Sequence, residues 1–138
     1  MMGRVHEYKI RARYSEIDGM KLVHNSIYQI YFEEARIDLV RSNDYAYEKM
    51  EKDGIMFPVS EVKIKYLKSI FYDELVTINV TVEYLKNFSF KFNYKIFKED
   101  NALSCEGYTI HPCIDKNTGD FIEISDSIRQ IMEQYLED

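Results

Sequence analysis

Residues 14–36, YSEIDGMKLVHNSIYQIYFEEAR, are the stretch of sequence that decides the fold. A run of apolar residues spaced by four begins in this stretch and predicts a long amphipathic helix with one buried face. Ser26 and Gln29 have the spacing of a capping box at the start of that helix. The apolar positions are Ile27, Tyr31, Ala35 and Leu39, with Ile30 and Phe32 widening the stripe.

The carboxylate of Asp18 precedes this helix by a short loop. The N-terminus of a helix carries about half a positive charge and several unpaired N–H groups. An acid beside that terminus therefore faces a place where a developing oxyanion is stabilised, an arrangement suited to acyl transfer. The alternative interpretation is a loop carboxylate that only caps a turn.

The remaining sequence predicts mainly strands. Residues 7–14 alternate between apolar and charged side chains, which is typical of a half-buried strand. After the long helix, residues 45–53 are predicted to form a short helix closed by Gly54, and beyond it the alternation of a strand returns. We predict further strands over residues 62–66, 76–84, 88–96 and 102–115, a short strand at 121–124 and an amphipathic helix at 127–136.

This order of elements predicts an α+β fold. The antiparallel sheet must cover the long helix, because both have an apolar face to bury. With 138 residues, 46% of them hydrophobic, the chain suits a single domain over residues 1–138.

Composition excludes several classes of partner. A formal charge of −6 argues against nucleic acid, since phosphate binding needs an excess of clustered Lys and Arg. No apolar run approaches the roughly 20 residues that cross a bilayer, and the N-terminus has no signal-peptide core, so we expect no membrane partner and a cytoplasmic protein. Cys105 and Cys113 lack metal-ligand spacing and are interpreted as reduced structural thiols.

One motif resembles a known family. It is similar to the signature of the hotdog-fold acyl-CoA thioesterases, in the branch named after 4-hydroxybenzoyl-CoA thioesterase, and it consists of Asp18, His24, Asn25, Tyr28, Phe32, Glu33, Ala35 and Arg36. Residues 59–76 and 107–119 extend the resemblance over nearly the whole chain. Two positions depart from it: Lys21 stands where the family usually has Gly, and Ser69 where it usually has Pro. We expect Gly19 to supply the flexibility of the missing glycine.

The resemblance implies a hotdog fold, an antiparallel sheet of five or six strands wrapped around one long central helix. It implies hydrolysis of an acyl-CoA thioester to a carboxylic acid and CoA, without a metal or redox cofactor. Hotdog domains pair edge to edge, so it also implies a homodimer or homotetramer with the site at an interface. An acyl-carrier-protein thioesterase is the nearest alternative. A non-catalytic acyl-CoA-binding protein is less favoured, as is a hotdog hydratase, because the D-x-N-P-x-H box is absent.

The resemblance also assigns roles within the site. Asp18 is the base or nucleophile, the backbone N–H of Asn25 is the oxyanion donor, and His24 positions Asp18 or a water unless it is a buried structural histidine. Glu33 and Glu34 are the alternative catalytic carboxylates. Tyr28 lines the acyl pocket or the core, and Lys86 meets a CoA phosphate or is simply solvated. The substrate-binding residues expected are Tyr28, Phe57, Val59, Ser60, Lys86 and Ser89.

Overall fold

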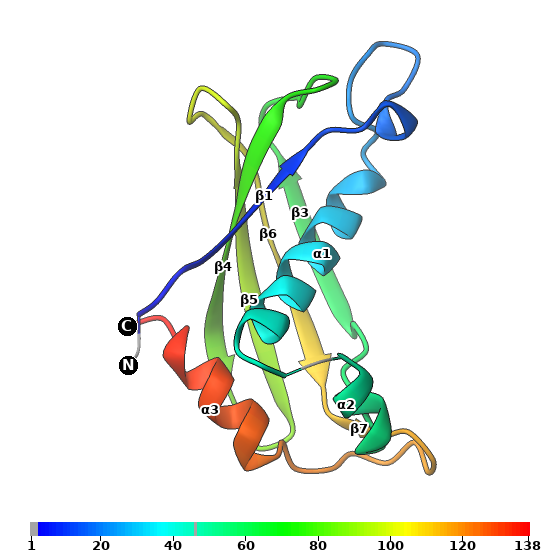
Figure 1. The fold of residues 1–138 in the computed structure, drawn as a ribbon, viewed down its shortest axis with the longest axis vertical. Helices are drawn as coiled ribbons and strands as arrows, with labels where there is room; N and C mark the ends of the chain where they lie inside the picture. Colours follow the sequence, from blue (N-terminus) through cyan, green and yellow to red (C-terminus); the bar gives the residue numbers. More distant parts are fainter. Residues whose placement is uncertain (1–2, 46) are drawn as a thin grey trace.

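The computed structural model describes residues 3–45 and 47–138. It contains a five-stranded antiparallel sheet in the order β1-β4-β5-β6-β3, and the helix α1 lies across one face of that sheet (Figure 1). A second sheet has only two strands, β2 and β7. The elements in chain order are β1 (His6–Arg11), the 3₁₀ turn η1 (Tyr14–Glu16), α1 (Ile27–Ser42), α2 (Tyr47–Lys52), β2 (Ile55–Met56), β3 (Glu61–Tyr66), β4 (Leu75–Leu85), β5 (Ser89–Phe97), β6 (Leu103–Pro112), β7 (Ile114–Asp115) and α3 (Asp126–Gln134).

The core lies between α1 and the inner face of the sheet. Phe32 of α1 stacks on Tyr94 of β5, with ring centroids 4.1 Å apart and an interplanar angle of 6°. Every second residue of β4 from Val76 to Val82 is buried, because successive side chains of a strand point to opposite faces. The residues of α1 that are buried are Tyr28, Tyr31, Phe32, Ala35, Leu39 and Val40.

Gly107 of β6 is required by a close approach of the backbone. A Cβ atom at this position would lie 2.2 Å from the carbonyl oxygen of Lys63 and 3.1 Å from the ring of Phe32. No side chain fits between these neighbours, so the glycine lets β3, β6 and α1 pack together.

The C-terminal part of the chain differs in detail from the sequence prediction. The strand expected over 102–115 is split, because residues 114–115 leave the large sheet and pair with β2. Phe121 forms a single bridge to Ile114 rather than a strand. The predicted final helix is α3, and the Ser125 side chain caps it by accepting a hydrogen bond from the backbone N–H of Ile128.

The short helix expected over 45–53 is present as α2, and the expected closing residue, Gly54, has a φ of 73°. Position 46 of that prediction lies outside the described residues. None of the helices in the described ranges combines the length and apolar character that a bilayer crossing needs.

Both cysteines are buried and free. Burial raises the pKa of the Cys105 thiol to about 12 and that of the Cys113 thiol to about 11. Both thiols are therefore protonated at neutral pH, as expected for structural rather than nucleophilic cysteines.

The sheet ends in two edge strands, β1 and β3. Exposed apolar side chains gather along the β3 edge and its flanks: Val59 (41% exposed), Val62 (37%), Tyr66 (50%) and Leu67 (44%). An exposed edge with apolar side chains is a surface suited to pairing with another strand.

Candidate active site

The loop before α1 is fastened to the helix by a buried carboxylate, Glu16. Its Oε1 accepts a hydrogen bond of 2.7 Å from the hydroxyl of Tyr31, and Arg13 donates to Oε2 at 2.7 Å. The backbone N–H of His24 donates to the carbonyl oxygen of Glu16 at 2.9 Å. Burial alone would raise the pKa of Glu16, but the hydrogen bonds from Arg13 and Tyr31 outweigh it and lower that pKa. Glu16 thus fixes both ends of the loop that carries Asp18.

Asp18 holds the turn within this loop. Its Oδ1 accepts hydrogen bonds from the backbone N–H groups of Met20 (2.8 Å) and Leu22 (3.2 Å). Its Oδ2 has no hydrogen-bond partner among the described residues. The carboxylate therefore does cap a turn, and it still has one oxygen available for another task.

The left-handed residue of the turn is Lys21, with a φ of 67°. Gly19 has no positive φ and is surrounded by open space. The expectation that Gly19 supplies the required flexibility is therefore wrong. Lys21 itself adopts the left-handed conformation, at the position where the family that this sequence resembles usually has glycine.

The start of α1 is capped differently from the prediction. The Ser26 side chain makes no cap hydrogen bond to the helix, so the capping box with Gln29 is wrong. The Ser26 hydroxyl lies 2.8 Å from Nδ1 of His24, and the Ser26 backbone N–H donates to the same nitrogen at 3.1 Å. Because Nδ1 accepts this bond, the neutral ring carries its proton on Nε2.

The backbone N–H of Asn25 makes no hydrogen bond to another described residue. The carbonyl oxygen of Asn25 accepts a bond of 3.1 Å from the hydroxyl of Tyr66, which fixes the orientation of this peptide. The N–H of the next residue, Ser26, is taken by His24, so Asn25 provides an available donor at the helix start.

These groups converge on one cavity of about 420 Å³. Among the residues that line it are four of the predicted site residues, Asp18, His24, Asn25 and Tyr28. Tyr28 is also buried, with its ring edge-on to Tyr66 at 5.0 Å, so it belongs to both the core and the cavity wall. His24 is exposed, which excludes its alternative interpretation as a buried histidine.

The other predicted substrate-binding residues lie elsewhere in the single chain. Phe57, Val59 and Ser60 precede β3, at the end of that strand away from the Asp18 loop, and the β4–β5 turn with Lys86 and Ser89 lies at that same end (Figure 1). In the described chain, Lys86 places its Nζ 4.5 Å from the ring centroid of Tyr84. One chain therefore does not bring these five residues to Asp18.

Two further cavities follow α1 along its length. The first, about 290 Å³, is lined by Ser26, Gln29, Ile30, Glu33, Arg36, Val59 and Thr109. The second, about 140 Å³, lies under the C-terminal half of α1 and includes Phe57. Arg36 lines both cavities, so they meet at its side chain.

A buried chain of hydrogen bonds begins beside the second cavity, and the sequence prediction did not include it. His111 is 1% exposed, its Nδ1 lies 3.1 Å from the carbonyl oxygen of Phe57, and its Nε2 lies 2.7 Å from the hydroxyl of Thr109. Tyr94 completes the chain, 2.6 Å from the same hydroxyl. Burial, reinforced by the charge of Arg36, lowers the pKa of His111 to about 4, so the ring is neutral at pH 7.

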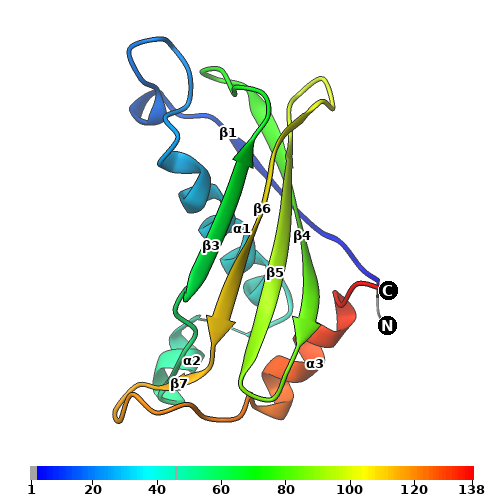
Figure 2. The same ribbon diagram turned by 180° about the vertical axis from the view of Figure 1, so that it is seen from behind.

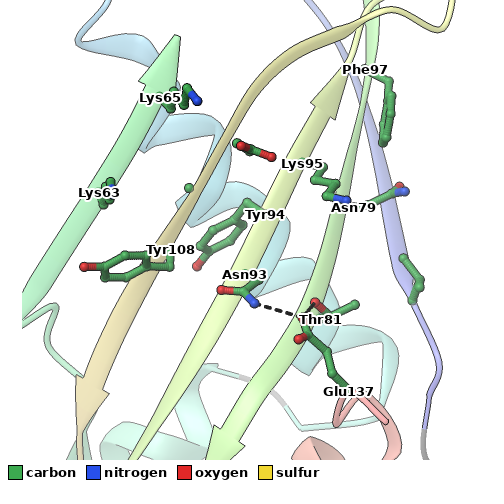
Figure 3. Close-up of a pocket in the computed structure, with 13 residues that line it drawn as sticks. Lys63, Lys65, Asn79, Thr81, Asn93, Tyr94, Lys95, Phe97, Tyr108 and Glu137 are labelled. Carbon is green, nitrogen blue, oxygen red and sulfur yellow. Dashed lines mark hydrogen bonds between the residues drawn. The ribbon is translucent and has the colours of Figure 1, made fainter. Parts of the chain in front are cut away.

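A further concavity, about 700 Å³ and larger than the three cavities above, lies on the outer face of the sheet, away from α1 (Figures 2 and 3). Lysine side chains are mixed there with carboxylates and hydrogen-bonded polar groups. Glu137, for example, accepts bonds from Thr81 (2.6 Å) and Asn93 (2.9 Å). Its lining contains neither Asp18 nor the start of α1, so this concavity is separate from the site.

Comparison with known proteins identifies the family. The model of the thioesterase-like superfamily matches residues 12–132. A provisionally named esterase of Aquifex aeolicus (strain VF5) is 34% identical over 126 residues, which are 91% of this chain and 96% of that protein. A provisionally named acyl-CoA thioesterase of Bacillus subtilis (strain 168), YneP, is 30% identical over 114 residues, 83% of each chain.

A solved structure of a thioesterase is also similar to this chain. The DHNA-CoA thioesterase of Staphylococcus aureus is 35% identical, with a TM-score of 0.83 over 89% of this chain and 81% of that chain. The chain therefore belongs to the thioesterase-like superfamily, shares its hotdog fold, and falls in the class of thioester hydrolases.

Proposed function

We propose that this protein hydrolyses acyl-CoA thioesters to a carboxylic acid and free CoA, with Asp18 as its catalytic carboxylate. The observation that carries the proposal is the cavity that Asp18 and Asn25 both line, where the Oδ2 of Asp18 and the backbone N–H of Asn25 have no hydrogen-bond partner among the residues that the structure describes. Its support among relatives is the 35% identity to a thioesterase that acts on a CoA ester.

The chemistry follows from these two groups. A thioester carbonyl in the cavity places its oxygen at the Asn25 N–H, where the helix terminus stabilises the negative charge of the transition state. Asp18 either attacks the carbonyl carbon or takes a proton from a water that attacks it. The C–S bond breaks, CoA leaves as the thiol, and water supplies the oxygen and hydrogen of the two products. His24, held by Ser26, positions the water or Asp18.

We further propose that the site is completed in a homodimer joined along β3, in which each sheet wraps its own central helix α1. In an antiparallel pair of identical strands, the start of one strand lies beside the end of the other. The Val59 end of one protomer then lies beside Tyr66, and hence the Asp18 cavity, of its partner. This brings Phe57, Val59 and Ser60 to the substrate.

The CoA moiety belongs at the same interface in this proposal. The β4–β5 turn, which includes Lys86 and leads into Ser89, lies at the same end of the sheet as the start of β3, so the dimer also moves these residues toward the partner's Asp18. They would meet the nucleotide phosphates, with Lys86 as a point charge. In this arrangement residues 1–138 form a single catalytic domain.

The test is the variant Asp18→Asn. It keeps the size of the side chain and the acceptor for the turn but removes the charge, so kcat should fall by roughly 10²–10⁴. Thiol release from acyl-CoA measures kcat, and thermal melting should show a nearly unchanged Tm.

Glu33→Gln and Glu34→Gln are the matched controls, because they remove carboxylates of α1 and should keep most activity. If Asp18→Asn retains activity within about threefold while one of the glutamine variants loses it, the catalytic carboxylate lies on the helix. Running the same assay with acyl carrier protein substrates identifies the carrier.

A further inference from the structure

Two consecutive peptide units at the start of α1 are held by hydrogen bonds, and among the described residues just one of their polar groups has no partner. In the unit between His24 and Asn25, the carbonyl oxygen accepts a bond of 2.9 Å from the backbone N–H of Ile27. The unit between Asn25 and Ser26 is held at both ends. Its carbonyl oxygen accepts a bond from the Tyr66 hydroxyl, and its N–H donates to Nδ1 of His24, both at 3.1 Å. The group left over is the N–H of Asn25.

Of these three partners, Tyr66 alone comes from a distant part of the chain. The bonds to Ile27 and His24 are local, whereas Tyr66 ends the edge strand β3, 41 residues from Asn25. Because a peptide unit is planar, a bond at each end fixes the whole plane, while a bond at one end alone leaves the plane free to tilt. Tyr66 therefore supplies the second fixed end of the plane that adjoins the Asn25 residue.

The Tyr66 side chain is itself held in place. The backbone N–H groups of the next two residues, Leu67 and Lys68, both donate to the carbonyl oxygen of Ser104, at 2.8 and 2.9 Å. The Ser104 hydroxyl donates to the carbonyl oxygen of Lys68 at 2.6 Å, so this segment is anchored on β6. The Tyr66 ring meets the ring of Tyr28 edge-on, with centroids 5.0 Å apart. Both contacts keep the hydroxyl at the wall of the cavity of about 420 Å³.

The direction of the Asn25 N–H matters most in the transition state. The negative charge on the thioester oxygen is largest there, and a donor that is already aimed at this oxygen needs no reorganisation. The Tyr66 hydrogen bond contributes little to folding, because water competes for both partners and Tyr66 is 50% exposed. Loss of the hydroxyl should therefore affect catalysis and leave stability nearly unchanged.

We propose that Tyr66 is a positioning residue of the oxyanion site: its hydroxyl locks the peptide that follows Asn25, so that the Asn25 N–H stays aimed at the carbonyl oxygen of the substrate. Nδ1 of His24 holds the other end of the same peptide. The inference rests on the proposed thioesterase function. It adds that β3, through Tyr66, takes part in the chemistry of its own chain, and that His24 acts on the oxyanion donor.

The variant Tyr66→Phe tests this role, because it keeps the ring and its contact with Tyr28 but removes the hydroxyl. With hexanoyl-CoA and benzoyl-CoA as substrates, kcat should fall roughly tenfold, less than for loss of a direct oxyanion donor. KM should change by less than about twofold, because the carbonyl of the bound substrate gains less from the same N–H than the transition state does. Tyr72→Phe is the matched control: Tyr72 is 52% exposed, lies outside the cavity lining and should keep the wild-type kcat.

A pair of stable ligands separates positioning from a general loosening of the cavity. The ketone analogue of hexanoyl-CoA, with CH2 in place of the thioester sulfur, keeps the carbonyl oxygen and resists hydrolysis, whereas S-hexyl-CoA lacks that oxygen. In calorimetric titration the wild type should bind the ketone more tightly than S-hexyl-CoA. Tyr66→Phe should remove most of this difference while changing the affinity for S-hexyl-CoA by less than about twofold. The infrared stretch of the bound ketone should move back toward its frequency in water in the same variant.

Three results would overturn the assignment. If Tyr66→Phe keeps the wild-type kcat and ketone affinity, its hydroxyl does not position the donor. If the variant weakens both ligands equally or melts several degrees lower, the role of the hydroxyl is structural. If the wild type binds the two ligands equally, the Asn25 N–H does not contact the carbonyl oxygen.

Failure of the thioesterase function itself has a different signature, because the wild type would then release no thiol from any acyl-CoA. Calorimetric titration with the ketone and S-hexyl-CoA needs no hydrolysis, so it still tests the position of the Asn25 N–H in that case. A preference for the ketone that Tyr66→Phe removes would support the assignment of Tyr66, and the absence of a preference in the wild type would contradict it.

Discussion

At the scale of single residues, Lys21 is the most unusual position of the site loop. A side chain with a Cβ atom in the left-handed region costs roughly 1–2 kcal/mol, whereas glycine adopts it freely. Lys21→Gly should therefore stabilise the protein by about 0.5–1 kcal/mol after the extra chain entropy of glycine is subtracted. Urea unfolding measures the difference. Gly19→Ala is the control and should be neutral or slightly stabilising, because Gly19 has no positive φ and a Cβ atom added there would meet no other atom within 4 Å. A loss of stability in Lys21→Gly would contradict this account of the turn.

Glu16 makes the stability of the site loop dependent on pH. Its pKa in the folded protein is lowered below its ordinary value of 4.5, so its contribution to stability is complete above pH 4.5 and is lost as the pH falls through the lowered folded pKa. Glu16→Gln should lower the Tm at pH 7, and the difference from the wild type should shrink as the pH is taken below 4.5. A difference that stays constant down to pH 3 would show that the charge of Glu16 is not what holds the loop.

At the scale of elements, the edge strand β3 decides how chains assemble. Wild-type protein in light scattering should have twice or four times the mass of 16.5 kDa. Val62→Glu introduces a charge into the apolar edge of both partners, so it should yield a 16.5 kDa species with little thioesterase activity. Val5→Glu is the matched control, because Val5 is 50% exposed beside the opposite edge strand and should leave the mass unchanged. A stable, fully active wild-type monomer would exclude both the dimer and the shared site.

Local patterns were sufficient to predict most elements. The alternation in β4 and the four-residue spacing in α1 arise from burial of one face. Tyr31, Ala35 and Leu39 are buried as predicted, whereas Ile30, which was expected to widen the apolar stripe, is 46% exposed. The cap of α1 was predicted wrongly because the Ser26 hydroxyl has two competing partners, and it contacts the ring of His24 instead of the helix backbone. The split at residue 113 was missed because the pairing of β7 with β2 depends on a segment nearly 60 residues earlier.

The residues of the candidate site were likewise predicted only where they are neighbours in the sequence. Asp18, His24, Asn25 and Tyr28 were predicted together because they are neighbours in the sequence around one helix start, and one cavity contains them. Arg36 was noted only as a member of the sequence motif, and His111 was not included in the predicted site. Their shared cavity depends on the packing of α1 against β5 and β6, which no local spacing encodes.

At the scale of the whole molecule, the two buried cysteines make the folded protein unreactive toward thiol reagents. A disulfide reagent that detects released CoA should therefore give no background from the native enzyme, whereas the unfolded chain should react at both of its two cysteines. The slow appearance of protein thiols in native buffer then measures how often the core opens, and a substrate analogue that stabilises the fold should slow it. Rapid labelling of the native protein would show that the sheet and α1 separate far more often than their packing implies.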